Sequence, residues 1–586
     1  MNIFILNLLY FLCIIIWMRN FEVSILIIEN LVSLYLELII IFTILVSLSF
    51  IKKKFIKNLL IGIFIFIYGS IFVAQVINIQ MIGDYINLVT LNNANQIDVI
   101  LNTELILKTI LLFFSFTVIS IYVIKNNTYI NKKRVIIFIS FVMLFVINIY
   151  INNQNKFMPI KEFTNLIFTS INHKNENITS LNVKDLKIAK EFNIYINPIN
   201  KTFQKENLYK QELPFLKTNN TEPNIIIFFI ESLSARLLGP YKEDMKEVTP
   251  NINDFANYST VVNGYYNHST PTAPGLYGQN CSIYPLLTYN EMDKTPNILK
   301  LSKIKCMASY AKEDGYNTIY FSHSRGHYTH LDQNFKIWGY DKVVMWRDFT
   351  KKFLNTDNLI LGEAGPSDHQ MMEGLVNFLK NNKSEKKFFL GLSTIESHIG
   401  RKTNEVDGIK YKNGANETLN LIHNLDDAFY DFWTYFKKSR YFNNTIVILT
   451  GDHTLYPNKD FKQIAGDDWI ASVYDNLSLI IYDPVHKLPK EYNANSTSID
   501  LAPTIMHLLN INKKRINSFL GNSIFDKKEY NNSFGISGYQ DFNIYINIDG
   551  NISNKKPIEI KDENVKSIYN SLSHILKYSK YLRMKD

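Results

Sequence analysis

The segment Asn224-Ile-Ile-Ile-Phe-Phe-Ile230 is a continuous apolar run of strand length, and a carboxylate, Glu231, follows it directly. A run without polar alternation is typical of a central strand that is buried on both faces. Four later runs share this character: Thr318–Phe321, Phe388–Leu392, Thr445–Leu449 and Leu477–Tyr482. Helical patterns alternate with them at Pro250–Tyr258, Met307–Asp314, Asp368–Leu379, Leu421–Phe436 and Ser498–Leu509. This alternation predicts an α/β fold whose mostly parallel sheet is covered by helices.

Side chains capable of chemistry follow three of these predicted strands. Glu231 follows the first strand, Glu396 and His398 follow the third, and Asp452 and His453 follow the fourth. In open α/β sheets, active residues gather beyond the carboxyl ends of the strands. Each residue taken alone also suits a helix cap or a separately satisfied side chain. Their shared position instead predicts a metal site, because carboxylates and imidazoles are the ligands that hard and borderline cations accept.

The turn His268-Ser-Thr-Pro-Thr-Ala-Pro-Gly275 supplies hydroxyl groups for the same site. A hydroxyl bound to a cation loses its proton more easily and becomes a usable nucleophile. Thr270 and Thr272 are both candidates for this role. The alternative is a turn in which the two threonines cap a helix.

Five apolar runs near the N-terminus have about the length of a membrane-spanning helix, which needs roughly 20 residues. They are Ile3–Met18, Leu31–Phe50, Leu59–Ile77, Leu105–Ile124 and Val135–Tyr150. Basic residues follow the second run and separate the fourth from the fifth, whereas the connection after the third run is acidic. Because basic loops stay in the cytoplasm, residues after Tyr150 are predicted to lie outside.

The charge and cysteine content limit the remaining function classes. The net charge is +9, but the Lys and Arg are scattered among 53 acidic residues, so nucleic acid is not an expected partner. There are three cysteines and no Cys-x-x-Cys spacing, which argues against a thiolate zinc site. Cys281 and Cys306 either pair in an exported domain or remain two buried thiols.

The strand-end motifs resemble those of the sulfatase and alkaline phosphatase superfamily, and are most similar to the membrane-bound lipoteichoic acid synthases and related phosphoglycerol transferases. The motifs are Ile230-Glu-Ser232, Val248–Asn253, Thr272-Ala-Pro274, Ser282-Ile-Tyr284, Gly339-Tyr-Asp341, Gly365–Asp368, Gly451-Asp-His453 and Ile499–Thr504. Two of the alignments agree on Thr272 rather than Thr270. The resemblance implies an alkaline-phosphatase-like sheet sandwiched by helices and preceded by a five-helix transmembrane domain.

The resemblance also implies roles for particular residues. One divalent cation, Mn²⁺ or Zn²⁺, would be bound by Glu231, Thr272, Asp452 and His453, with Thr272 as the nucleophile. His398 would contact the substrate or protonate the leaving group. The family's Trp-x-Arg is not reproduced in Ser324–Leu331, where Arg325, His327 and His330 are candidate phosphate ligands; a solvated loop is the alternative. Asp368 and Asp500 are interpreted as helix caps.

The expected domains are a transmembrane domain (1–151), a membrane-proximal linker (152–222), an extracytoplasmic catalytic domain (223–525) and a C-terminal extension (526–586). Helical segments of the linker, such as Val183–Phe192, are predicted to lie near the membrane surface. Heavy use of Asn, Ile and Lys suggests a bacterial source, so the expected location is the cytoplasmic membrane, with the catalytic domain outside or periplasmic.

The expected reaction is transfer of a phospho-alcohol head group, phosphoglycerol first, from a membrane phospholipid to a cell-envelope glycan or lipid acceptor. A phosphoethanolamine transferase is the alternative. A sulfatase is less favoured, because the resemblance implies a Cys or Ser precursor of formylglycine where this chain has Thr272. A non-catalytic, membrane-anchored binding protein belongs to a different class, and bound metal distinguishes it from an enzyme.

Overall fold

The computed structural model describes scattered positions between residues 44 and 75 and, with short gaps, residues 178–285, 304–398 and 401–584; the longer gaps there are 217–221, 324–329, 355–364, 538–542 and 554–561. The chain divides into two compact units, Met1–Lys174 and Asn175–Asp586. Within the described residues, no helix is both long and apolar enough to cross a membrane. The five predicted spans fall largely outside those residues, so they stay predictions.

Eight strands of the described chain form one sheet in the order β4-β3-β5-β1-β6-β7-β2-β8. Their bounds are β1 Asn224–Ile230, β2 Thr260–Tyr266, β3 Asn317–Ser322, β4 Lys342–Met345, β5 Phe388–Ser393, β6 Thr445–Gly451, β7 Leu479–Tyr482 and β8 Glu491–Thr497. Only β7 runs antiparallel to its neighbours among these strands. The predicted mostly parallel sheet is therefore confirmed, and the quoted first segment is its central strand β1, flanked by β5 and β6.

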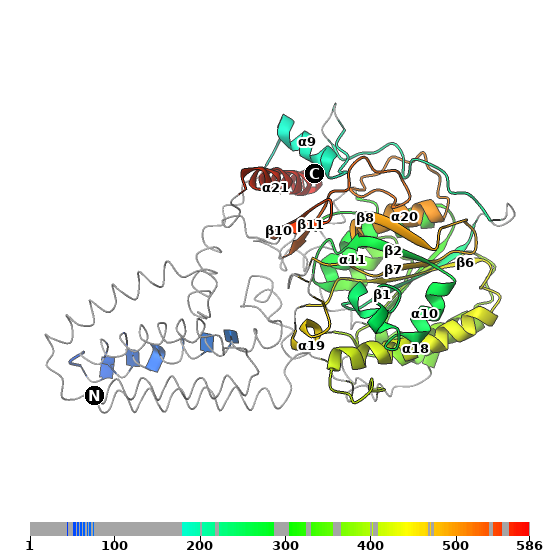
Figure 1. Cartoon of the computed structure of the whole chain (residues 1–586), viewed down its shortest axis with the longest axis horizontal. Helices are drawn as coiled ribbons and strands as arrows, with labels where there is room; N and C mark the ends of the chain where they lie inside the picture. Colours follow the sequence, from blue (N-terminus) through cyan, green and yellow to red (C-terminus); the bar gives the residue numbers. More distant parts are fainter. Residues whose placement is uncertain are drawn as a thin grey trace. The chain divides into compact units, whose positions relative to one another are not determined.

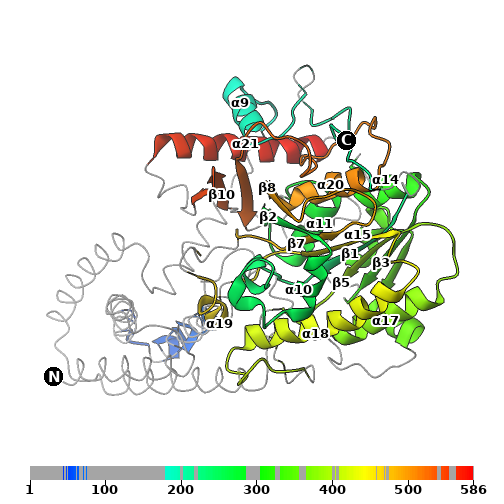
Figure 2. The ribbon, with the colours of Figure 1, turned by 45° about the vertical axis from the view of Figure 1, so that its right-hand side comes forward.

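Helices cover both faces of this sheet (Figure 1 and Figure 2). On one face lie α10 (Pro250–Asn257), α17 (Asp368–Asn381) and α18 (Glu417–Lys438). On the other lie α11 (Thr272–Cys281), α14 (Met307–Glu313), α15 (Leu331–Ile337) and α20 (Leu501–Leu508). The helix α17 begins where Ser367 and Gln370 form a capping box. The first face buries a continuous apolar core that includes Phe228 of β1 and Phe429, Phe432 and Trp433 of α18.

The segments that precede and follow the eight-stranded sheet in the sequence form a second layer. A three-stranded antiparallel sheet consists of β9 (Ser533–Ser537), β10 (Asn543–Ile548) and β11 (Asn551–Ser553). The C-terminal helix α21 (Glu563–Met584) lies between β10 and α9 (Val183–Glu191), as Figure 2 shows. Backbone bridges also tie Lys205 to Asn517 and Phe215 to His486. The described part of the predicted linker is thus built into the same unit as the eight-stranded sheet.

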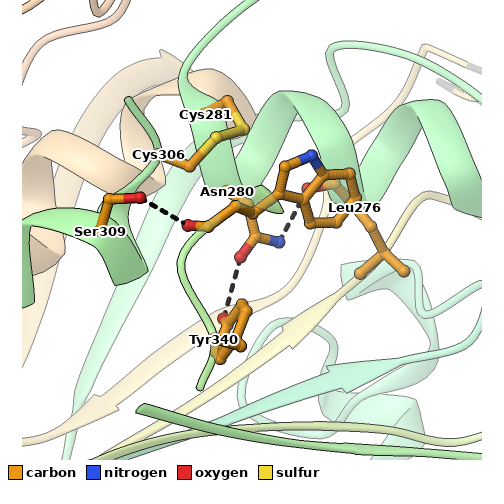
Figure 3. Close-up of a disulfide and its surroundings, with 7 residues drawn as sticks. Leu276, Asn280, Cys281, Cys306, Ser309 and Tyr340 are labelled. Carbon is orange, nitrogen blue, oxygen red and sulfur yellow. Dashed lines mark hydrogen bonds between the residues drawn. A yellow bond between two sulfur atoms is a disulfide. The ribbon is translucent and has the colours of Figure 1, made fainter. Parts of the chain in front are cut away.

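A disulfide links Cys281 to Cys306, so these two cysteines pair and do not remain two buried thiols. Cys281 is the last residue of α11, and Cys306 directly precedes α14. Figure 3 shows Asn280 beside the bridge, where its side-chain oxygen accepts a hydrogen bond of 2.9 Å from the hydroxyl of Tyr340. The disulfide and this bond hold the C-terminal end of α11.

We expect reduction of this disulfide to lower the free energy of unfolding by about 3 kcal/mol, because the 25-residue separation closes a sizeable loop in the unfolded chain. Denaturant titrations of the full chain in detergent, with and without reductant, measure the difference. The double variant C281S/C306S should behave as the reduced protein and ignore reductant. Cys13→Ser is the matched control and should keep the full reductant effect; a wild-type midpoint insensitive to reductant contradicts the expectation.

Candidate metal centre

The carboxyl ends of β1 and β6 bring three predicted ligands together. Glu231 follows β1, and Asp452 and His453 follow β6, which pairs with β1 along its whole length. One ligand atom from each of the three residues lies within 4.8 Å of the others. Nε2 of His453 is 3.4 Å from Oε1 of Glu231, and all three side chains are buried. The expectation that active residues gather beyond the carboxyl ends of the strands, here called the strand-end rule, therefore placed these three side chains correctly.

Ser232 fixes the relative position of the two carboxylates. Its φ of 52° lies in the left-handed region, which is uncommon for a residue with a side chain. In this conformation its backbone N–H donates to Oδ1 of Asp452 at 2.8 Å, and its hydroxyl donates to Oε1 of Glu231 at 2.6 Å. The N–H of His453 also donates to Oδ1 of Asp452 at 2.7 Å. Strained residues of this kind concentrate at functional sites, and here the strain orients both acids.

Thr272 is the first residue of α11, and its Oγ1 donates to Oε2 of Glu231 at 3.2 Å. All ten residues of this helix are buried. The unpaired backbone N–H groups of a helix N-terminus favour negative charge nearby. Thr270, in the same turn, instead bonds to the side chain of Tyr456. The structure thus brings Thr272, and not Thr270, onto the carboxylate of Glu231.

The sequence of α11 explains why this helix approaches the strand end so closely. The side-chain amide of Gln279 donates to the carbonyl oxygens of Gly451 and Asp452 at 3.0 and 2.7 Å. A Cβ at Gly275 would lie only 2.3 Å from the carbonyl oxygen of Asp452. Glycine at this position lets the helix backbone pack directly against the turn that carries Asp452.

The charges at this site are unbalanced. Burial alone would raise the pKa of Glu231, but its hydrogen bond to His453 and the charges of His398 and His453 lower it. Burial raises the pKa of Asp452, and the negative charge of Glu231 raises it further. Burial would lower the pKa of His453, but the charges of Asp452 and Glu231 raise it. Two buried acids that repel each other, with an imidazole and a hydroxyl beside them, fit a divalent cation well.

Two further histidines interact electrostatically with Glu231. His398 lies beyond β5, and its charge acts directly on Glu231. His323 lies one residue beyond β3, is buried, and has Nδ1 3.1 Å from Oγ of Ser393. Burial lowers the pKa of His323 to about 4, although the charge of Glu231 opposes this shift. The sequence interpretation missed His323, yet the strand-end rule applied to Thr318–Phe321 would have found it.

Comparison with known proteins agrees with this geometry. Residues 223–511 match the family model "Sulfatase". This chain carries a sulfatase-family domain. Lipoteichoic acid synthase 2 of Bacillus subtilis is 24% identical over 314 residues, which are 50% of this chain and 45% of that protein. Lipoteichoic acid synthase of Staphylococcus saprophyticus is 23% identical over 350 residues, covering 54% and 51%. The chain thus matches about half the length of these curated relatives.

Two solved structures share the fold of the sulfatase-family domain. A protein of the alkaline phosphatase superfamily from Vibrio parahaemolyticus superimposes with a TM-score of 0.51 at 18% identity, over 70% of this chain and 99% of that one. The lipoteichoic acid synthase LtaP from Listeria monocytogenes gives a TM-score of 0.50 at 18% identity, over 68% and 97%. The predicted superfamily and its alkaline-phosphatase-like fold are confirmed.

The predicted phosphate ligands remain predictions. Arg325 and His327 lie outside the described residues. His330 is half-buried just before α15, with Nδ1 3.4 Å from the side-chain nitrogen of Gln333. Nothing in the described part of the sulfatase-family domain assigns these three residues to a substrate.

The interpretation as helix caps is wrong for Asp368 and holds for Asp500 in position only. Ser367 is the N-cap of α17, and Asp368 is already the first residue of that helix. Asp500 is the N-cap residue of α20, but its side chain makes no cap bond. Its carboxylate accepts from the backbone N–H of Asn522 at 2.7 Å and pairs with Lys528 at 2.9 Å. Asp residues near helix starts are common caps, but here tertiary partners compete for both carboxylates.

Proposed function

We propose that the sulfatase-family domain transfers a phospho-alcohol head group, phosphoglycerol in the first instance, from a membrane phospholipid to a cell-envelope acceptor through Thr272. The observation that carries the proposal is the position of Oγ1 of Thr272, 3.2 Å from Glu231 at the N-terminus of a buried helix. A hydroxyl in that position has an acceptor for its proton and backbone N–H groups for the phosphate that it would receive.

Four residues would hold the cation: Glu231, Asp452, His453 and Thr272 through Oγ1. A bound Mn²⁺ or Zn²⁺ would lower the pKa of the threonine hydroxyl and offset charge on the phosphate oxygens. Ser232 keeps both carboxylates in place through its hydrogen bonds of 2.8 and 2.6 Å. The strained turn thus orders the ligands before any substrate arrives.

The transfer would proceed in two displacements. Oγ1 of Thr272 passes its proton to Oε2 of Glu231 and attacks the phosphorus, and the bond to the diacylglycerol oxygen breaks while His398 donates a proton to that oxygen. The product of this step is a phosphodiester on Thr272 that carries the alcohol. An acceptor hydroxyl then attacks the same phosphorus and gives its proton to His398. The bond between phosphorus and Oγ1 breaks, and Oγ1 of Thr272 takes its proton back from Glu231. Two steps avoid bringing a lipid and a glycan to one phosphorus together.

Two findings support the choice of substrate and location. The relatives that match the domain are named lipoteichoic acid synthases, which favours glycerol over ethanolamine as the head-group alcohol. The disulfide between Cys281 and Cys306 suits an oxidising compartment, which favours an extracytoplasmic domain on a membrane-anchored chain. The donor is then a lipid of the membrane that carries the enzyme.

We expect the full chain, reconstituted in liposomes with Mn²⁺, to release diacylglycerol from labelled phosphatidylglycerol. The same preparation with labelled phosphatidylethanolamine measures the alternative head group. Thr272→Ala protein in matched liposomes is the control and should release nothing above background. If neither lipid is consumed while a soluble sulfate ester is hydrolysed, the domain is a hydrolase of sulfate esters and the transferase proposal fails.

A further inference from the structure

Asp368 and Glu396 form a reciprocal contact beneath the turn that carries His398. The backbone N–H of Asp368 donates to Oε1 of Glu396 at 2.6 Å. In return, Oδ1 of Asp368 faces the backbone N–H groups of Ile395 and Glu396 at 3.4 and 3.5 Å. Both side chains are fully buried. This pair, here called the carboxylate clasp, joins the N-terminus of α17 to the end of β5.

The hydrogen-bond donors divide unequally between the two acids. Glu396 receives two short bonds of 2.6 Å, from the N–H of Asp368 and from the side-chain amide of Asn424 on α18. Asp368 has only the two long contacts, and its Oδ2 is buried without a hydrogen-bond partner. A carboxylate that accepts strong bonds at a helix N-terminus keeps its charge, whereas a buried carboxyl with weak donors keeps its proton.

The electrostatic surroundings agree with this division. Burial raises the pKa of Asp368 well above its usual range, and the charges of Glu396 and Glu231 raise it further. Burial also raises the pKa of Glu396, but its hydrogen bonds and the positive charges of His369 and Arg401 oppose that shift. His369 in turn faces Asp427 and Asp431 of α18, at 3.5 and 3.8 Å.

The carboxylate clasp connects directly to the turn that carries His398. Thr394 accepts a 3.2 Å hydrogen bond from the backbone N–H of Glu231 through Oγ1. The hydroxyl of Ser397 donates to the carbonyl oxygen of Glu231. Glu396 lies between these two residues, and His398 follows Ser397. The turn is therefore fixed to α17 on one side through Glu396 and to the ligand Glu231 on the other.

We propose that Asp368 and Glu396 hold one proton between them, located on Asp368, and that this neutral–charged pair positions the turn carrying His398 for proton transfer. The two residues touch neither substrate nor cation in this arrangement, so they are positioning residues. The part that concerns activity rests on the proposed function, whereas the location of the proton does not.

The proton is tested by the pH dependence of stability, measured as the thermal midpoint of the full chain in detergent. A raised pKa in the folded state contributes stability that is complete below the unfolded value of 3.8 and is lost as the pH rises towards the folded value. Asp368→Asn has no proton to lose. The thermal midpoint of the variant minus that of wild type should therefore increase by roughly 5 °C from pH 5 to pH 8. A difference that stays flat with pH overturns the assignment of the proton.

The positioning role is tested by transfer kinetics at pH 7. Glu396→Gln presents one oxygen to two donors and turns an N–H₂ group towards one of them, so we expect kcat to fall roughly 10- to 100-fold with KM nearly unchanged. Asp368→Asn mimics the protonated acid and should stay within about 3-fold of wild type. Glu373→Gln, an exposed position on the same helix, is the matched control and should have no effect.

Four outcomes separate the two claims. Equal losses of kcat in D368N and E396Q would overturn the positioning role. A rise in the KM of E396Q with kcat unchanged would overturn it as well. If E396Q does not fold, the comparison of D368N with wild type still decides where the proton lies. If wild type transfers no lipid head group, the proposed function fails, and the stability measurement still decides the clasp because it needs no substrate.

Discussion

Thr272→Ala reduces transfer to background, by on the order of 10⁴-fold or more, because one substitution removes both the nucleophile and a cation ligand. The expectation follows from the hydroxyl that donates to Glu231 at the start of α11. Ser at this position keeps the hydroxyl and should retain part of the activity. Diacylglycerol release from labelled phosphatidylglycerol by the full chain measures both variants.

Thr270→Ala is the matched control for this prediction. Thr270 is equally buried in the same turn but bonds to Tyr456 instead of Glu231. Its loss should leave transfer within a few-fold of wild type. Enzyme quenched during turnover with donor but without acceptor should yield a phosphopeptide modified at Thr272. A modification at Thr270, or an active Thr272→Ala variant, would show that the nucleophile is misassigned.

Removal of the cation should abolish transfer and destabilise the protein at the same time. Without a cation, the buried carboxylates of Glu231 and Asp452 repel each other within the 4.8 Å group of ligand atoms. A cation present at about 1,000 times its dissociation constant adds about 4 kcal/mol to the free energy of unfolding. Chelation should therefore lower the thermal midpoint of the full chain, and Mn²⁺ or Zn²⁺ should restore both the midpoint and the activity.

Asp452→Asn supplies the control for chelation. It keeps the shape of the side chain and its acceptor oxygen for Ser232 but removes one ligand charge. Its midpoint should respond far less to chelator than that of wild type, because less cation is bound at the start. Elemental analysis of both proteins gives the metal content independently of activity. Full transfer by protein shown to be free of metal would exclude the site.

The prediction of individual strands succeeded because their signal is local. Each of β1, β3, β5, β6 and β7 is a short apolar run that the sequence displays without reference to other segments. The polar edge strand β8, Glu491–Thr497, gave no such signal and was missed. The direction of β7 could not be predicted from the sequence either, because a strand buried on both faces has the same apolar pattern whether it runs parallel or antiparallel.

The α/β class, the family motifs and the set of residues that follow the strands could be predicted from the sequence, since these depend on neighbouring residues. Which of those residues meet depends on the tertiary fold. Glu231 and Asp452 are 221 positions apart in the chain and come together because β1 pairs with β6. Asp368 and Glu396 meet because α17 packs against the end of β5. Such contacts depend on how the whole sheet and its covering helices bury their apolar faces together, and no local pattern of residues encodes that choice.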